Sequence, residues 1–259
     1  MEALNLISKK LFTESWVNLL NNVIAVTDIL NNGGTSYYEV IGARYKFNPL
    51  NNILSLNSSV FNPKKAAAMY FWYKNADNKD ASIINYFDEY SRCIDENHKE
   101  FNSNYGLYAN DGIKLCINAL MNDKNSRQAC FMINNNAAMS ENSIDKLCTN
   151  AVMFFIRNTQ LLMIIQMRSS NMLTLLPYDA FIFSTWYAKV YNALIRKYPW
   201  LKIGAINVHV GSLHFYTSDF YEKSKCDTQH NVSSMFSFEE MCDHNFENIL
   251  EKRLIEFLK

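Results

Sequence analysis

Four short segments of the sequence carry side chains that could do chemistry. One contains an isolated cysteine, Cys148, whose thiolate form would be a nucleophile. Another contains His214 and Tyr216, which are two residues apart and would share one face of a strand. The segments are 125–127, 145–150, 167–171 together with 176–179, and 210–216.

Each of these residues also has an ordinary structural explanation. An isolated cysteine such as Cys148 is most often a small buried apolar side chain. His214 and Tyr216 could hydrogen-bond locally at a sheet edge, and Arg168 could pair with an acid on a neighbouring helix. Asp179 falls in the first turn of an expected helix, where the helix dipole favours an acid without any ligand. The segments taken singly therefore do not define a function.

The elements that would position these segments are predicted from hydrophobic periodicity and from the residues that begin or end helices and strands. Near the C-terminus, Ser237 and Glu240 form a capping-box pattern that predicts the start of a helical stretch over 238–259. Gly42 predicts a bulge or a close backbone approach in the first strand. Interspersed helices and strands indicate an α+β fold with one large mixed β-sheet and flanking helices. We expect helices over 3–30, 64–74, 83–97, 107–121 and 177–198, and strands over 35–47, 128–133, 151–156, 161–168 and 203–216.

Composition limits the class of protein. The chain has 259 residues with 25 Lys+Arg and 25 Asp+Glu, and this charge balance excludes a globally basic nucleic-acid binder. No uncharged apolar run reaches the ~18 residues of a membrane span, and residues 1–10 lack the apolar run of a signal peptide. No repeat or linker divides the chain. We therefore expect a single domain over 1–259 in the cytoplasm (the host cytoplasm if the protein is viral), with no direct nucleic-acid binding and no membrane.

The six cysteines form no CxxC pair, so we expect reduced thiols. Two Cys/His pairs occur late in the chain, at Cys226/His230 and Cys242/His244, but their spacing fits no zinc pattern, so no metal is expected.

Taken together, the motifs and their order resemble the thymidylate synthase superfamily over about residues 34–221. The motifs that carry the resemblance are Asn104-Tyr105-Gly106, Ser126-Arg127, Cys148-Thr149-Asn150, Arg168-Ser169 and the run from Gly211 to Tyr216. Within that superfamily the chain looks most like the bacteriophage deoxycytidylate (dCMP) hydroxymethylases, which also read Cys-Thr-Asn, Met-Arg-Ser and Val-Gly-Ser-Leu-His. The resemblance implies a thymidylate-synthase-like fold, a homodimer formed through the sheet, a pyrimidine deoxynucleotide monophosphate as substrate and 5,10-methylenetetrahydrofolate as cofactor.

The resemblance also implies roles for individual residues. Cys148 matches the nucleophile that adds to C6 of the pyrimidine, and Tyr105 matches a residue near the reacting base. Arg168, which would activate the thiol, also matches a phosphate ligand together with Ser169. The remaining matches are Arg127, supplied to the phosphate by the other subunit, and His214 with Tyr216, which hydrogen-bond the sugar 3′-hydroxyl.

Asp179 matches the position that chooses the base. Uracil-using members of the superfamily carry Asn there, whereas a carboxyl group favours cytosine, whose exocyclic N4 is a donor. The resemblance therefore implies hydroxymethylation of dCMP to 5-hydroxymethyl-dCMP. The alternatives are dUMP-directed or folate-independent C5 chemistry in the same fold, or a nucleotide-binding relative that has lost catalysis.

Several positions depart from the pattern of the superfamily, mostly on the folate side of the site. Met69 stands where a proton-relaying glutamate is found, and methionine cannot act as an acid or base. Asn171, among the expected substrate-binding residues, replaces an aspartate that holds the pterin ring. Leu175 replaces a glycine beside the folate. Two basic residues of the phosphate site are replaced by Gln128 and Asn32.

Overall fold

A six-stranded mixed sheet forms the centre of the molecule. The computed structural model describes residues 30–32, 35–51, 61–94, 100–134, 144–219 and 235–259. The strand order is β1-β2-β6-β5-β4-β3, and β5 and β6 are parallel whereas all other neighbouring strands are antiparallel. The strands are β1 (Leu30–Asn32), β2 (Thr35–Phe47), β3 (Cys130–Met132), β4 (Thr149–Arg157), β5 (Gln160–Asn171) and β6 (Lys202–Tyr216).

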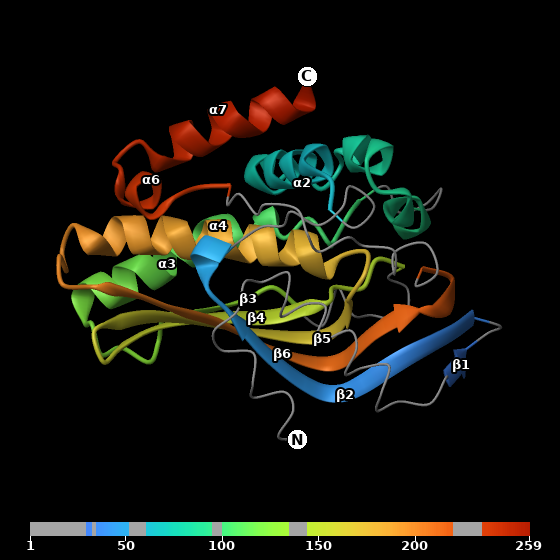
Figure 1. The fold of residues 1–259 in the computed structure, drawn as a ribbon, viewed down its shortest axis with the longest axis horizontal. Helices are drawn as coiled ribbons and strands as arrows, with labels where there is room; N and C mark the ends of the chain where they lie inside the picture. Colours follow the sequence, from blue (N-terminus) through green and yellow to red (C-terminus); the bar gives the residue numbers. More distant parts are fainter. Residues whose placement is uncertain (1–29, 33–34, 52–60, 95–99, 135–143, 220–234) are drawn as a thin grey trace.

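The helices gather on one face of this sheet, as Figure 1 shows from the side. The helices α3 and α4 lie next to the sheet, and α2, α6 and α7 form a further layer outside them. The α-helices are α2 (Pro63–Asn75), α3 (Gly106–Asn122), α4 (Leu176–Ile195), α6 (Phe238–Cys242) and α7 (Phe246–Leu258). Short 3-10 helices are η2 (Pro49–Asn51), η3 (Ala81–Asn85) and η4 (Asp88–Cys93).

Helix α4 is the crossover that the parallel pair β5/β6 requires. Pro177 lies in its first turn, where a missing N–H costs nothing, and 17 of its 20 residues are buried. The helix is apolar almost all round because it is covered by the sheet on one side and by α2, α3, α6 and α7 on the other.

A tyrosine of α4 joins both parallel strands. The hydroxyl of Tyr187 donates to the carbonyl oxygen of Leu161 at 2.9 Å and accepts from the backbone N–H of Gly204 at 2.9 Å. These contacts lie where the register of β5 and β6 shifts, between Leu161 and Met163. The buried phenol therefore fixes the helix to the two strands at the irregular start of their pairing.

All five predicted strands and the predicted helices over 64–74, 107–121 and 177–198 are confirmed, with ends that differ by a few residues. The predicted helix over 83–97 is wrong within the described residues, because the chain forms the two short 3-10 helices η3 and η4 instead. The C-terminal stretch begins at Ser237 with the predicted capping box, but it is divided into α6 and α7 by an extended residue, Asp243. The predicted helix over 3–30 lies outside the described residues except for Leu30, which belongs to β1.

Gly42 forms neither a bulge nor a close approach. The pairs on either side of it, Ile41 with Ser212 and Ala43 with Val210, keep the same register, and a Cβ added at Gly42 would meet nothing within 4 Å. Its backbone has φ +69°, a left-handed conformation that glycine adopts without strain. Glycine is therefore favoured at position 42 by the positive φ of the backbone and not by close packing around it.

No helix among the described residues is both long and apolar enough to span a bilayer.

Candidate active site

A cavity of about 350 Å³ opens where β5 ends and α4 begins, a volume within the usual range for small-molecule sites. Its walls come from η4, the start of α3, the segment before β4, the end of β5 and the start of α4. The residues that matter most for its chemistry are Tyr90, Tyr105, Asp145, Cys148, Arg168 and Asp179. Two of the four segments singled out in the sequence, 145–150 and 167–171 with 176–179, therefore meet here.

Cys148 and Arg168 are held side by side by backbone contacts. The N–H of Arg168 donates to the carbonyl oxygen of Cys148 at 2.8 Å, which pairs the segment before β4 with β5. The Arg168 guanidinium is fixed by carbonyl oxygens of the same segment, with Nε donating to Leu147 at 2.8 Å and Nη2 donating to Lys146 at 2.9 Å. This leaves Nη2 at 3.6 Å from the Cys148 sulfur.

Opposing influences act on the pKa of the Cys148 thiol. Burial raises the pKa of Cys148, the Arg168 guanidinium lowers it, and the carboxylates of Asp179 and Asp145 raise it. The net pKa lies above the ordinary thiol value, so the empty cavity favours the protonated thiol. Activation of the sulfur would therefore require proton removal in addition to the guanidinium.

Asp179 lies in the first turn of α4 with only 9% of its surface exposed. Burial raises the pKa of its carboxyl from 3.8 to about 7. A buried carboxyl with this pKa can be neutral or charged near physiological pH, so it can present either a donor or only acceptors to a ligand.

Tyr105 links the start of α3 to the segment that carries Cys148. Its buried hydroxyl accepts from the backbone N–H of Thr149 at 3.2 Å, and its ring stacks on Tyr73 with centroids 5.3 Å apart. Tyr73 also hydrogen-bonds to Tyr90 through its side chain, and both line the cavity. Gly106 makes this packing possible, because a Cβ there would lie 1.7 Å from the carbonyl oxygen of Tyr73.

Asp145 is a site residue that sequence reasoning did not assign. Its carboxylate accepts from the backbone N–H and the hydroxyl of Ser103 at 2.7 and 2.8 Å, and Asn102 donates to its carbonyl oxygen at 3.3 Å. Burial raises the pKa of this carboxyl, and the hydrogen bonds from Ser103 oppose the rise. Asp145 therefore ties the loop before Tyr105 to the segment that carries Cys148. Its place three residues before the cysteine was the only signal in the sequence.

A second cavity, of about 720 Å³, adjoins the first, because Glu89 and Asn171 line both. His214 and Tyr216 line it from β6 with ring centroids 5.5 Å apart, as their spacing predicts. Burial lowers the pKa of His214, which favours the neutral imidazole. Ser212, on the same strand face, donates a short hydrogen bond to Glu39 of β2.

Asn171, which lines both cavities, stabilises the turn between β5 and α4. Its side-chain oxygen accepts from the backbone N–H groups of Leu173 and Thr174 at 2.9 and 3.1 Å, and this holds the turn between β5 and α4. Ser169, another expected ligand, lines the first cavity.

Two residues lie away from both cavities. Arg127 is exposed in the connection between α3 and β3, so a single chain does not bring it to Cys148. Met69 is packed in the core with 1% of its surface exposed. The residue one turn later on α2, Tyr73, faces the cavity instead.

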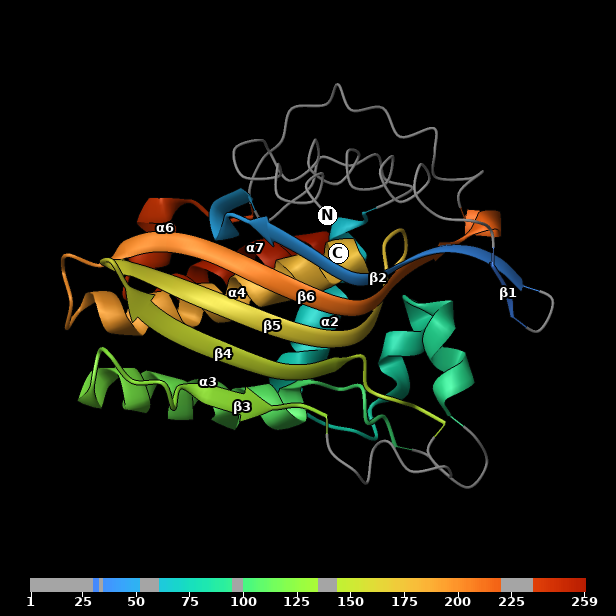
Figure 2. The same ribbon diagram turned by 90° about the horizontal axis from the view of Figure 1, so that it is seen from below.

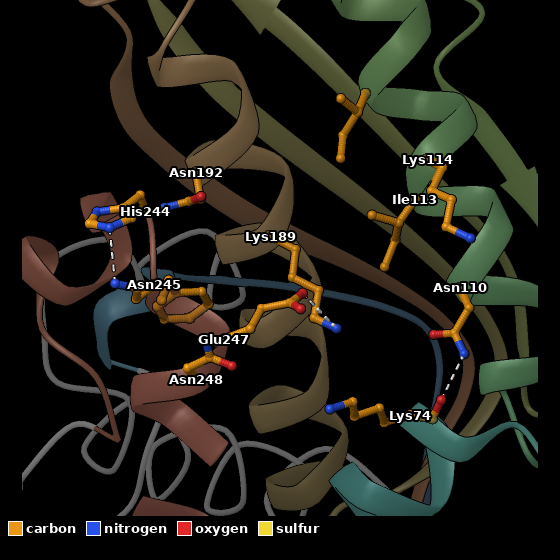
Figure 3. A pocket seen from close by; sticks show the side chains of 12 residues that line it. Lys74, Asn110, Ile113, Lys114, Lys189, Asn192, His244, Asn245, Glu247 and Asn248 are labelled. Atoms are coloured by element: carbon orange, nitrogen blue, oxygen red, sulfur yellow. Dashed lines mark hydrogen bonds and ion pairs between the residues drawn. The ribbon is translucent and has the colours of Figure 1, made fainter. Parts of the chain in front are cut away.

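A third cavity, of about 540 Å³, lies between α2, α3, α4 and the start of α7 and is drawn in Figure 3. Its cations next to α7 have acidic partners: Lys74 pairs with Glu251 at 2.6 Å and Lys189 with Glu247 at 3.1 Å. In Figure 3 the side chains of Lys189 and Glu247 meet within the cavity. We interpret this cavity as a gap in the interface where α7 packs on α2 and α4, with the two ion pairs joining the helices across it.

Among the residues that the structure describes, no group of three or more His, Cys, Asp or Glu side chains could hold a metal ion. The Cys226/His230 pair lies outside those residues. No family model matches the chain, and no curated protein matches it.

Proposed function

We propose that the protein carries out one-carbon chemistry at C5 of a pyrimidine deoxynucleotide, with Cys148 as the nucleophile and dCMP as the substrate. The observation that carries the proposal is the 3.6 Å approach of the Arg168 guanidinium to the Cys148 sulfur in a cavity that also contains the buried Asp179. A nucleophile, a cation and a base-reading carboxyl within one small-molecule cavity are the parts that this reaction needs.

Cys148 would act by adding to C6 of the pyrimidine. A bond forms between sulfur and C6, the electrons of the C5–C6 double bond shift toward C5, and C5 becomes nucleophilic. Arg168 would stabilise the thiolate before the addition, and a nucleotide phosphate bound by Arg168 and Ser169 would add the binding energy of the substrate.

Asp179 would select cytosine. The N4 amino group of cytosine can donate to this carboxyl whether it is neutral or ionised. The O4 of uracil needs a donor, which the ionised carboxylate lacks, so dUMP would leave a buried acceptor unpaired at a cost of ~1–3 kcal/mol.

The sugar would extend toward the second cavity. His214 and Tyr216 line that cavity on one face of β6 and offer a neutral imidazole and a phenol to a sugar hydroxyl. Because Glu89 and Asn171 line both cavities, the two cavities adjoin, and one nucleotide would extend from the first into the second.

Methylenetetrahydrofolate would supply the electrophilic carbon in a hydroxymethylase. The residues present do not fit the pterin contacts of the superfamily, because the Asn171 oxygen is occupied by two backbone N–H groups and Leu175 places a branched side chain at the cavity wall. The test of the proposed function therefore uses chemistry that needs only the nucleotide.

A homodimer through the sheet would complete the phosphate site with Arg127 of the second copy. Leu162 and Ile164 on β5 alternate with buried residues and are half-buried on the sheet face opposite the helices, which lie behind the sheet in Figure 2. Arg127→Ala and Cys148→Ala should each be inactive alone. In an equal mixture about half of the dimers are heterodimers, and one of the two sites in each heterodimer has both residues intact, so about 25% of all sites should be active. Absence of any restored activity would reject donation of Arg127 across the interface.

The direct test measures release of tritium from C5 of [5-³H]dCMP, which requires only reversible addition of sulfur at C6. We expect release by the wild type, none by Cys148→Ala, and slower release from dUMP. Equal release by both proteins would reject Cys148 as nucleophile, and faster release from dUMP would reject the role of Asp179. Tight dCMP binding without any release would instead indicate a nucleotide-binding protein that has lost catalysis. A second assay with methylenetetrahydrofolate separates hydroxymethylation from folate-independent exchange.

A further inference from the structure

The proposed function requires a proton carrier at C5, and this inference rests on that function. Once sulfur has added at C6, C5 gains a proton or a one-carbon group and must later lose its original proton before sulfur can leave. Neither Cys148, which is bonded to the ring, nor Arg168, which stays protonated, can accept that proton. A carboxylate in reach of C5 is the simplest acceptor that the chain could supply.

Three carboxylates line the cavity: Asp145, Asp179 and Glu89. Asp145 already accepts two hydrogen bonds from Ser103 and holds the loop before Tyr105. In the proposed complex Asp179 is occupied by the N4 amino group of the base.

Glu89 neither holds a loop by hydrogen bonds nor binds the N4 edge of the base in the proposed complex. It lies on the 3-10 helix η4 with its side chain exposed, and it lines both the first cavity and the second. Within the part of the chain that the structure describes, no hydrogen bond or ion pair occupies its carboxylate. It therefore stands at the junction of the two cavities with open acceptor oxygens and access to solvent.

The backbone around Glu89 is fixed by its neighbours, although the Glu89 side chain is exposed. The next residue, Tyr90, is buried, hydrogen-bonds to Tyr73 and packs edge-to-face on Trp72 with centroids 5.3 Å apart. The N–H of Tyr90 also donates to the carbonyl oxygen of Phe87 at 3.1 Å. A carboxylate on a fixed support can be aimed at one substrate atom at little further entropic cost.

We propose that Glu89 is the proton carrier at C5, a catalytic residue that serves the chemistry for which Met69 is unsuited. In the exchange reaction the Cys148 sulfur bonds to C6, and C5 takes a proton from the Glu89 carboxyl. The carboxylate then accepts the original C5 proton and exchanges it with water. The electrons of the broken C5–H bond restore the C5–C6 double bond as the sulfur leaves. No oxidant, reductant or second substrate is consumed.

The test is tritium release from [5-³H]dCMP by Glu89→Gln, with dCMP binding measured by calorimetry on the same preparation. We expect release to fall at least ~100-fold, the usual loss when a general acid–base group is removed, whereas the dissociation constant should change less than about threefold. Glu100→Gln is the matched control, because Glu100 is exposed and lines neither cavity, so its variant should release tritium at the wild-type rate.

A rescue experiment separates proton transfer from a structural role. In Glu89→Ala, formate or acetate should restore part of the lost release, and neither should stimulate Glu100→Ala. Glu89→Gln releasing tritium within fivefold of wild type would overturn the inference, as would parallel loss of binding and release without rescue. Absence of release by the wild-type protein would overturn the proposed function and this inference with it.

Discussion

The buried carboxyl of Asp179 makes a quantitative prediction about stability and pH. Its pKa is raised from 3.8 to about 7 by burial, so the folded protein holds this proton more tightly than the unfolded chain. The difference is about 3 pKa units, or ~4 kcal/mol at full titration. Because the folded pKa is the higher one, this group lowers the free energy of unfolding as pH rises from about 4 to about 7, and its effect is constant above that.

Asp179→Asn removes the titration and keeps the size of the side chain. Between pH 5 and pH 8 the wild type should lose roughly 2–3 kcal/mol of stability through Asp179 that the variant does not lose. Urea unfolding of both proteins at the two pH values measures this difference directly. The variant should therefore gain stability relative to wild type as pH rises.

A control with the same chemical change strengthens the comparison. Asp111 is on α3 with 83% of its side chain exposed, so Asp111→Asn should change stability by no more than about 0.5 kcal/mol at either pH. If Asp179→Asn and wild type kept the same stability difference at pH 5 and pH 8, the Asp179 carboxyl would not be neutral in the folded protein. The raised pKa of Asp179 and its attribution to burial would then be wrong.

Three further substitutions test the geometry of the site and fold. Arg168→Met should raise the pKa of the Cys148 thiol, because it removes the guanidinium 3.6 Å from the sulfur. Alkylation of Cys148 by iodoacetamide at pH 8, measured by peptide mass spectrometry, should then slow about tenfold for each pKa unit. An unchanged rate would show that this contact does not affect the reactivity of the sulfur. Gly106→Ala should lower the free energy of unfolding by at least ~2 kcal/mol, because the new Cβ would overlap the backbone of α2, and a smaller loss in urea unfolding would contradict that packing. Ser237→Ala should cost ~1 kcal/mol through loss of the capping box, whereas Ser237→Thr should retain most of the wild-type stability in the same experiment.

Much of the fold could be predicted because local signals and tertiary packing agree. The apolar run after Pro177 predicts a buried helix, and α4 is one, since proline fits its first turn and the run is long enough to cross the sheet. The capping box at Ser237 also appears as predicted. The helix predicted over 83–97 fails because η3 and η4 are shaped by their packing under Trp72, through Tyr90, rather than by a helical repeat.

Periodicity alone predicts the candidate site only where residues lie next to each other on strands, whereas the expectations for Tyr105 and Asp179 come from the resemblance. The pairing of β4 with β5 brings Cys148 beside Arg168, and alternation along β6 brings His214 beside Tyr216. Asp145 and Glu89 could not be found in this way, because their position at the cavity depends on loops and 3-10 helices that no periodicity describes. Their place at the cavity is evident only from their neighbours in space.

The hydroxyl of Tyr187 has a consequence for the order in which the chain assembles. Antiparallel neighbours such as β4 and β5 can zip up from their connecting turn, but β5 and β6 are separated by the whole of α4. Their starting alignment is set by a phenol that reaches both strands only after the helix has settled on the sheet. Nucleation of the central strand pair should therefore wait for helix docking, and a nascent chain that has not yet produced β6 would expose one long unpaired edge of β5.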